Sequence, residues 1–359
     1  MGLRNEIIDI AKGLGIILMV IGHTPCPKYL HDFIYLFHMP LFFLLSGYCF
    51  NPKYLSDARV FLVRKIKAFY IPYIMWALLF LFLYNICFDL YIYSEKVSYY
   101  GVVFHPYTLE EIGEHALSIL VSMTGHAPLL GAFWFMHSIL WGNIVFFFLL
   151  RAMKITRVVA ILLGVSILFL YFKIEIPIIR FNYLDAIAAL FIAMGYYVRE
   201  GEYKIFQNQN IGALLFLCLL LLAYFLPMSI QTVTMKKLAF FMASGVLGSV
   251  LVMKISKHIS CFPKFSSVMS YVGMHTLIIL ALHMLCFKVC SYVICYRYDL
   301  PLWLVGEHPT ISKIHRGGEF WIMYSICGVV LPLLILHLYQ QLVKVIKNKI
   351  KDYGTSIRL

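Results

Sequence analysis

The sequence predicts an all-α membrane protein, a polytopic bundle of about ten transmembrane helices. The chain of 359 residues is 62% hydrophobic and only 13% charged, and its mean hydropathy is +0.84. Soluble globular proteins average about 45–50% apolar and about 25% charged residues. So few charged side chains cannot cover the surface of a soluble enzyme of this length. The aromatic content of 16% also argues against a disordered chain.

Ten apolar segments have the length that a membrane-spanning helix needs, about 17–25 residues. They are apolar on all sides, whereas the strands of a membrane β-barrel alternate between apolar and polar residues. In chain order, the expected spans are 7–24, 33–50, 68–88, 130–150, 156–172, 183–199, 210–227, 236–253, 267–290 and 320–343. We therefore expect one integral-membrane domain, 1–359, with no soluble domain and two long loops at about 89–129 and 291–319.

Lys and Arg set the expected orientation, because they are enriched on the cytoplasmic side of membrane proteins. With the N-terminus inside, 19 of the 30 Lys and Arg residues fall in inner segments and 9 in outer ones. Both termini are then cytoplasmic, the two long loops face outward, and the cell (cytoplasmic) membrane is the expected location. The net charge of +13 therefore reflects the orientation of the chain in the membrane. Because the cations lie between long apolar segments, nucleic acid is not an expected partner. The nine Cys residues include no CxxC pair, so no metal site is expected.

The first span carries three ionisable side chains, Asp9, Lys12 and His23, where such residues are costly. Lys12 and His23 are eleven residues apart, which places them on one helix face about 16 Å apart along the axis. Asp9 lies one turn from Lys12 on that face and is close enough to form an ion pair with it. Functional roles and a simple ion pair at the membrane interface are both compatible with Asp9 and Lys12.

Other polar side chains are expected at the depth of His23, in the outer half of the bundle. Each alone is more often a packing residue than a functional one, but their common depth makes them candidates for substrate binding. They are His38, Trp134, His137, Asn182 and His283. At the inner side, a cytoplasmic loop contains Arg64, Lys65 and Lys67. These cations satisfy the positive-inside rule, and one or two of them are also suited to bind an anionic phosphate.

Several motifs carry a resemblance to a known family. The first motif is the pair Lys12 and His23, which ten residues separate. The other motifs, in chain order, are Phe37-His38-Met39-Pro40, Ser46-Gly47-Tyr48, Arg64-Lys65-Ile66-Lys67, Ile71-Pro72-Tyr73, Phe133-Trp134-Phe135 and Tyr271-Val272-Gly273 followed by the run to His283. In order and spacing they resemble membrane acyltransferase family 3, within the branch that contains fucose 4-O-acetylase and exopolysaccharide acyltransferases. Met274-His275 departs from the resemblance, because relatives more typically have an Arg-Asn pair there.

This resemblance implies transfer of an acyl group, most often acetyl, from cytoplasmic acyl-CoA to a sugar hydroxyl of a cell-surface or lipid-linked glycan. The implied catalytic residues are His23 as general base with Lys12 and Asp9. The implied acetyl-CoA site includes Lys12, Arg64, Lys65 and Lys67. The alternative is a glycan transporter of the same family, although transporters more often show paired repeats. The sequence leaves open the acceptor sugar, acetyl or succinyl as the acyl group, direct transfer or an acyl-enzyme, and the oligomeric state.

Overall fold

The structure is a computed structural model that describes residues 5–99, 102–200, 211–311 and 320–356. The described helices are α1 (Glu6–Gly22), α2 (Lys28–Tyr35), α3 (His38–Tyr48), η1 (Pro52–Ser56), α4 (Ala58–Lys65), η2 (Ile66–Tyr70), α5 (Ile71–Phe82), α6 (Ile86–Asp89), α7 (Leu109–Ser122), η3 (Pro128–Phe133), α8 (Trp134–Ala152), α9 (Ile155–Phe172), α10 (Tyr183–Glu200), α12 (Ile211–Phe225), η4 (Met235–Lys237), α13 (Leu238–Ile259), α14 (Pro263–Met274), α15 (Thr276–Arg297), η5 (Leu302–Gly306) and α16 (Trp321–Ser356). The strands β1 (Ser98–Tyr99) and β2 (Val102–Val103) form a short antiparallel hairpin.

The predicted helical membrane fold is confirmed. Within the described residues, seven helical segments are long and apolar enough to cross a membrane. They are Lys28–Tyr48, Ala58–Phe82, Pro128–Ala152, Ile155–Phe172, Met235–Ile259, Thr276–Arg297 and Trp321–Asn348. Three further expected spans coincide with α1, α10 and α12. The chain is therefore a multi-pass membrane protein, while ten crossings and cytoplasmic termini stay predictions.

Several spans differ from their expected course. The one expected at 33–50 begins already with α2 and is interrupted at Phe37, whose φ of −145° and ψ of −14° are not helical. The span expected at 267–290 is divided into α14 and α15 at His275, whose φ of −113° and ψ of 25° are not helical. The span expected at 68–88 ends at Phe82 and is preceded by the wide π-helical turn η2. Pro72 explains this turn, because proline has no N–H and its ring clashes with the carbonyl group four residues earlier. Such π-turns are frequent at functional sites.

The two long loops also contain structure that the apolar pattern does not show. The first loop holds the hairpin and α7, and α7 begins with a capping box between Thr108 and Glu111. The second loop begins later than expected, because α15 continues to Arg297. This second loop includes η5, which contacts α15. Since α7 contacts α5 and η5 contacts α15, both loops pack onto the bundle in their described parts.

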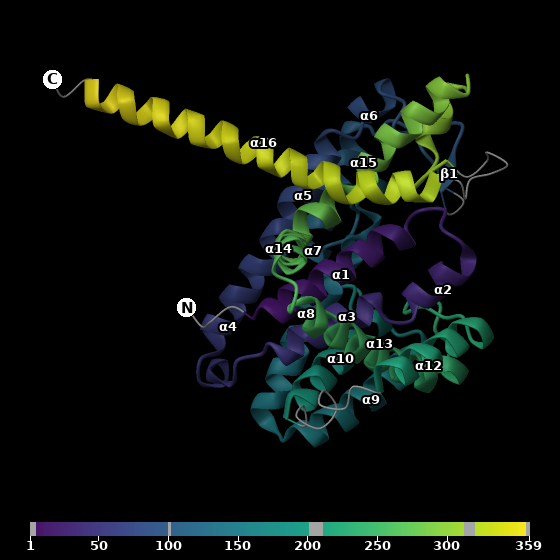
Figure 1. Ribbon diagram of the computed structural model, residues 1–359, viewed down its shortest axis with the longest axis vertical. Coiled ribbons are helices and arrows are strands. Elements are labelled where there is room, and N and C mark those ends of the chain that lie inside the picture. The colour runs from purple at the N-terminus through teal and green to yellow at the C-terminus, as the bar shows by residue number, and fades with distance from the viewer. Residues whose placement is uncertain (1–4, 100–101, 201–210, 312–319, 357–359) are drawn as a thin grey trace.

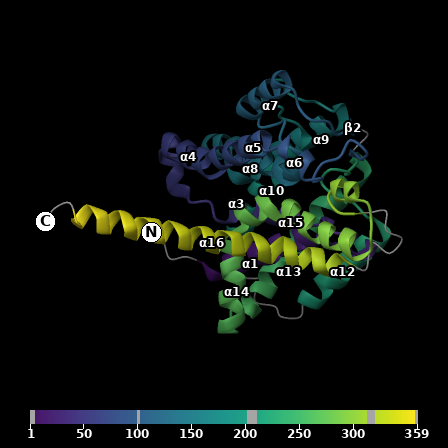
Figure 2. The same cartoon turned by 90° about the horizontal axis from the view of Figure 1, so that it is seen from above.

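Helix α1 occupies the middle of the bundle and contacts α14, α13 and α3 (Figure 1). Helix α3 packs along α10, and α15 packs along α16. Helix α1 begins on the side of the molecule toward which α4 and the far end of α16 also lie (Figures 1 and 2). The 36 residues of α16 form a helix of about 54 Å, longer than the hydrocarbon core of a bilayer, about 30 Å.

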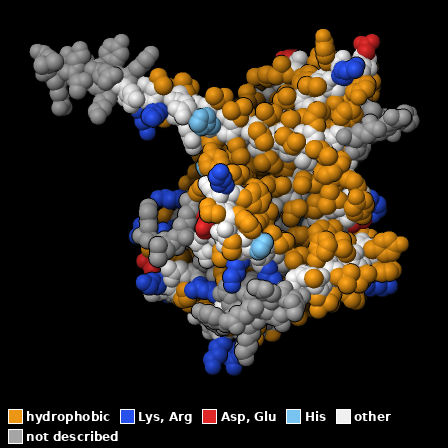
Figure 3. Space-filling model, viewed as in Figure 1, with side chains coloured by type: hydrophobic (Ala, Val, Ile, Leu, Met, Phe, Trp, Pro, Cys, Tyr) orange, Lys and Arg blue, Asp and Glu red, His pale blue; other side chains and the backbone are white. Residues whose placement is uncertain are grey.

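Apolar side chains cover much of the face shown in Figure 3, with Lys and Arg side chains along its edges and over its lower part. Large hydrophobic residues such as Phe82, Phe172 and Phe225 are 67%, 63% and 69% exposed. A soluble monomer rarely exposes large continuous apolar patches. This surface is the one expected for a bundle that is surrounded by lipid.

Glycine residues allow α1 and α14 to approach closely. A Cβ atom on Gly273 would lie 1.8 Å from the backbone oxygen of Asp9, and one on Gly13 would lie 2.3 Å from that of Met269. No Cβ atom tolerates such distances from backbone, so the two helices would have to separate. The glycines beside the Asp9–Lys12 pair therefore set the position of α14 against α1.

We expect Gly273→Ala to destabilise the protein by about 1–3 kcal/mol, the usual cost of an overpacked contact. Gly164→Ala in the middle of α9 is the matched control, because a Cβ atom there meets nothing within 4 Å. The measurement is the Tm of each purified variant in detergent. Equal melting temperatures for the two variants would contradict the close contact.

Candidate active site

Two cavities lie along α1, one toward each end of the helix. The basic cavity, about 530 Å³, contains Asp9, Lys12, Ser46, Cys49, Arg64 and Lys65 among its lining residues. The histidine cavity, about 450 Å³, is lined in part by His23, His31, His38, His308, Tyr35 and Trp134. Met19, Met39 and Leu280 line both cavities. The two cavities therefore adjoin at an apolar junction between Lys12 and His23.

Lys12 and Asp9 form the predicted ion pair at the basic cavity. The Lys12 Nζ atom lies 3.6 Å from Asp9 Oδ1, and both residues line the cavity. The side chain of Lys12 is 37% exposed and that of Asp9 is 9% exposed. The carboxylate is thus held inside the helix packing, while the ammonium group faces the cavity. The ammonium group remains accessible to an anionic ligand from that side.

The end of α4 brings two further cations to the basic cavity. The Arg64 guanidinium donates a hydrogen bond to the Tyr54 hydroxyl and lies 5.4 Å from the centre of its ring. The Lys65 Nζ atom lies 5.5 Å from the ring centres of Phe61 and Phe69. Aromatic faces attract such cations and hold them without neutralising their charge. Lys67 is exposed and is not among the lining residues, so the structure does not bring it to this cavity.

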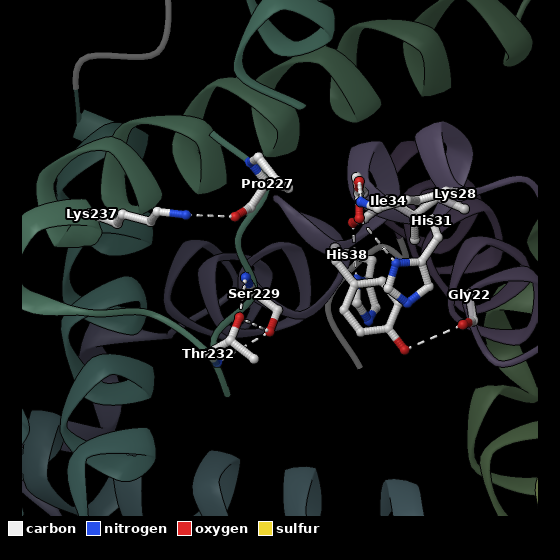
Figure 4. A network of polar contacts seen from close by, with 11 residues as sticks. Gly22, Lys28, His31, Ile34, His38, Pro227, Ser229, Thr232 and Lys237 are labelled. Atoms are coloured by element: carbon white, nitrogen blue, oxygen red, sulfur yellow. Dashed lines mark hydrogen bonds and ion pairs between the residues drawn. The ribbon is translucent and has the colours of Figure 1, made fainter. Parts of the chain in front are cut away.

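The histidine cavity is formed where α1 ends and α2 turns into α3. His23 is the C-cap residue of α1, and its half-buried ring opens into the cavity. The buried His38 donates a hydrogen bond from Nδ1 to the Ile34 carbonyl oxygen at 2.9 Å, which leaves Nε2 as an acceptor. In Figure 4, the segment that contains Ser229 and Thr232 lies across from the residues His31 and His38. This cavity therefore offers ring nitrogens and hydroxyl groups within an otherwise apolar wall.

His283 lies beneath His23 on α15. The centres of the two rings are 5.3 Å apart, and His283 is completely buried. His283 is not itself among the residues that line the histidine cavity. The structure thus brings His23 and His283 together as predicted, with His23 between His283 and the cavity.

His308 and Lys288 are two residues of this region that the sequence pattern did not indicate as site residues. His308 lines the histidine cavity. Burial lowers the pKa of His308 well below its ordinary value, and the charges of Lys288, His23 and His283 lower it further. The buried Lys288 on α15 donates hydrogen bonds to the carbonyl oxygens of Val305 at 2.9 Å and Glu307 at 2.6 Å. Lys288 thereby fixes the loop that carries His308. The available sequence signal was a lysine inside an expected span.

The structure places His137 and Asn182 at a third cavity, about 250 Å³, which is separate from the histidine cavity. Both ring nitrogens of His137 are engaged, Nδ1 with Asp185 Oδ1 at 2.9 Å and Nε2 with the Ile179 carbonyl oxygen at 2.8 Å. At the start of α10, the Asn182 N–H group donates to Asp185 Oδ2 at 2.8 Å, and the Asp185 N–H group donates to the Asn182 carbonyl oxygen at 3.1 Å. Trp134 lines both this cavity and the histidine cavity. Substrate binding by His137 and Asn182 stays a prediction.

We expect Lys288→Met to loosen the His308 loop and to lower Tm. Methionine fills the space of the lysine stem, but the buried carbonyl oxygens of Val305 and Glu307 lose their donor, which costs about 1–3 kcal/mol for each unsatisfied group. The affinity for any ligand of the histidine cavity should fall, while that for a ligand of the basic cavity should not change. Hydrogen exchange of residues 302–311 measures the loosening directly. Unchanged exchange in Lys288→Met would contradict this role.

A family model described as an acyltransferase domain matches residues 5–339. No curated protein and no solved structure matches the chain. The match includes all residues of the basic cavity and of the histidine cavity.

Proposed function

The chain belongs to the acyltransferase 3 family, and on that premise we propose that it transfers an acetyl group from acetyl-CoA to a hydroxyl group of a glycan. The acceptor is a sugar of a cell-surface or lipid-linked glycan. The donor enters the basic cavity from the cytoplasm, and the acceptor enters the histidine cavity from the opposite side of the cell membrane.

One observation carries this proposal, namely that the two cavities share Met19, Met39 and Leu280. A transferase with a charged donor and a hydroxylated acceptor needs two binding regions that meet at the reacting atoms. Here three cations lie on one side of the junction and His23 lies on the other. Because the junction is apolar, it suits the uncharged thioester end of the donor and excludes water from the reaction.

The basic cavity fits the chemistry of coenzyme A. Its phosphate groups require cations, which Lys12, Arg64 and Lys65 supply, and Arg is suited to bidentate phosphate contacts. The apolar lining beyond these cations, which includes Ile16, Met39 and Phe135, fits the uncharged arm that ends in the thioester. The phosphates are thus held toward Lys12, with the thioester directed toward His23.

In the proposed reaction, a ring nitrogen of His23 accepts the proton of the acceptor hydroxyl as its oxygen attacks the thioester carbonyl carbon. The carbon–sulfur bond then breaks, and the leaving thiolate of coenzyme A takes the proton from His23. The products are the acetylated sugar and free coenzyme A, so His23 returns to its starting state. An imidazole ring can both accept a proton and return it, which suits His23 to the two transfers.

The direct test is thiol release by the purified protein in lipid nanodiscs. We expect acetyl-CoA to release free thiol in the presence of candidate glycan acceptors, with a matching gain of acetyl groups on the glycan by mass spectrometry. A glycan transporter predicts the reverse result in proteoliposomes, with glycan movement across the membrane and no consumption of thioester. Mass analysis of cell-surface glycan with and without the protein then identifies the acceptor.

A further inference from the structure

The side chain of His283 has a defined tautomer. Its Nδ1 atom lies 3.1 Å from the Ile279 carbonyl oxygen and 3.0 Å from that of Leu280. A carbonyl oxygen only accepts hydrogen bonds, so Nδ1 carries the hydrogen. In the neutral ring, Nε2 is then a hydrogen-bond acceptor. The backbone of α15 therefore holds this ring with a lone pair on its outer nitrogen.

That outer nitrogen of His283 is buried and meets no hydrogen-bond partner among the described residues. A buried acceptor without a partner costs about 1–3 kcal/mol, and such groups are rare in native proteins. The ring contacts of His283 are with Phe287, which has no polar hydrogen to donate, and with His23. Of these two ring neighbours, His23 is the one with an N–H group to offer.

Two other polar side chains of this region, Lys288 and His38, donate their hydrogen bonds to other groups. Lys288 on the same helix uses its ammonium group on the Val305 and Glu307 carbonyl oxygens. The buried His38 directs its Nδ1–H group at its own helix. His23 is the C-cap residue of α1 and opens into the cavity, so its ring has room to rotate. At a ring-centre distance of 5.3 Å, such a rotation is sufficient to align an N–H group of His23 with Nε2 of His283.

We propose that His283 is a positioning residue, whose Nε2 accepts a hydrogen bond from one N–H group of His23 and thereby selects its tautomer. The inference rests on the proposed function of His23 as general base. The selected tautomer carries its lone pair on the nitrogen that faces the histidine cavity, where the acceptor hydroxyl binds. A carboxylate holds the catalytic histidine of serine proteases in the same way. In this chain an imidazole fixed by the backbone of α15 takes that place.

This arrangement also serves the proton transfers. When His23 accepts the hydroxyl proton, the ring carries two N–H groups, and His283 accepts a hydrogen bond from one of them. The other N–H group faces the junction and returns its proton to the leaving thiolate. No proton is gained or lost by His283 in the cycle.

Two variants of His283 separate positioning from packing. Glutamine retains an acceptor oxygen near the position of Nε2, whereas leucine fills the space without one. We expect His283→Leu to lower kcat about a hundredfold with KM for acetyl-CoA unchanged, and His283→Gln to restore about tenfold of that loss. The Tm of both variants should remain near that of the native protein. Full activity in His283→Leu, or equal losses in both variants, would overturn the proposal.

A spectroscopic measurement tests the inference without any activity. The ¹⁵N shifts of histidine-labelled protein distinguish the two imidazole tautomers, and loss of a signal in His23→Ala assigns His23. We expect one tautomer of His23 in the native protein and a mixture in His283→Leu. An unchanged His23 spectrum in His283→Leu would refute the positioning role of His283. Absence of thiol release by the native protein would instead refute the proposed function, so the two failures are distinguishable.

Discussion

Replacement of His23 by alanine should abolish acetyl transfer, with a fall in kcat of about 10²–10⁴-fold, the range that general bases contribute. His23 is the ionisable side chain of α1 that opens into the histidine cavity beside the junction of the two cavities. Without it, the acceptor hydroxyl has no base at the thioester. The measurement is thiol release from acetyl-CoA by the purified variant in nanodiscs.

The matched control for this experiment is His337→Ala. His337 is exposed on α16 and lines neither cavity, so its loss should leave both kcat and Tm unchanged. Binding of acetyl-CoA should persist in His23→Ala, because the basic cavity is intact. Full thiol release by His23→Ala would show that another group acts as the base. Loss of glycan export in that variant, with glycan acetylation unchanged, would instead favour a transporter.

The second large effect is expected at the basic cavity, from Lys12→Met and Arg64→Gln. Each variant should raise KM for acetyl-CoA about tenfold to a hundredfold, because a hydrogen bond to a charged group contributes about 1.5–3 kcal/mol. The value of kcat should change little, since neither side chain lies at the junction with His23. Initial rates at varied acetyl-CoA concentration measure both constants.

Arg59→Gln is the control for these two variants. Arg59 is exposed on the same helix as Arg64 and does not line the basic cavity, so KM should stay at its native value. An equal rise of KM in all three variants would indicate a general surface attraction of the donor. Unchanged KM in Lys12→Met and Arg64→Gln would place the donor elsewhere in the protein.

The helices and the charged face of α1 could be predicted from the sequence because each follows a regular pattern within one segment. Apolar runs of membrane length predicted the helices, because a bilayer requires backbone hydrogen bonds to be satisfied within each segment. The spacing of Asp9, Lys12 and His23 predicted one functional face on α1, because the helical period is known. The ion pair between Asp9 and Lys12 confirms that spacing within a single helix.

Contacts between distant segments were not predictable in the same way. His308 reaches the histidine cavity because Lys288 holds its loop, and the two are twenty residues apart across the end of α15. His137 was expected at the depth of His23, but Asp185 and the Ile179 carbonyl oxygen hold it at another cavity. Depth in the membrane limits which residues can meet, but the rotation and tilt of each helix decide which ones do.

The sequence by itself determined the membrane class, the helical fold and the charged face of α1, because each depends on the composition or period of one continuous segment. Tertiary structure alone decided that two cavities meet at Met19, Met39 and Leu280, which come from three different helices. It also decided that His283 lies against His23 while Lys67 lies outside the basic cavity. Such placements depend on how two helices pack against each other, which no single segment of sequence specifies. Gly273, which allows α14 to contact α1, is an example.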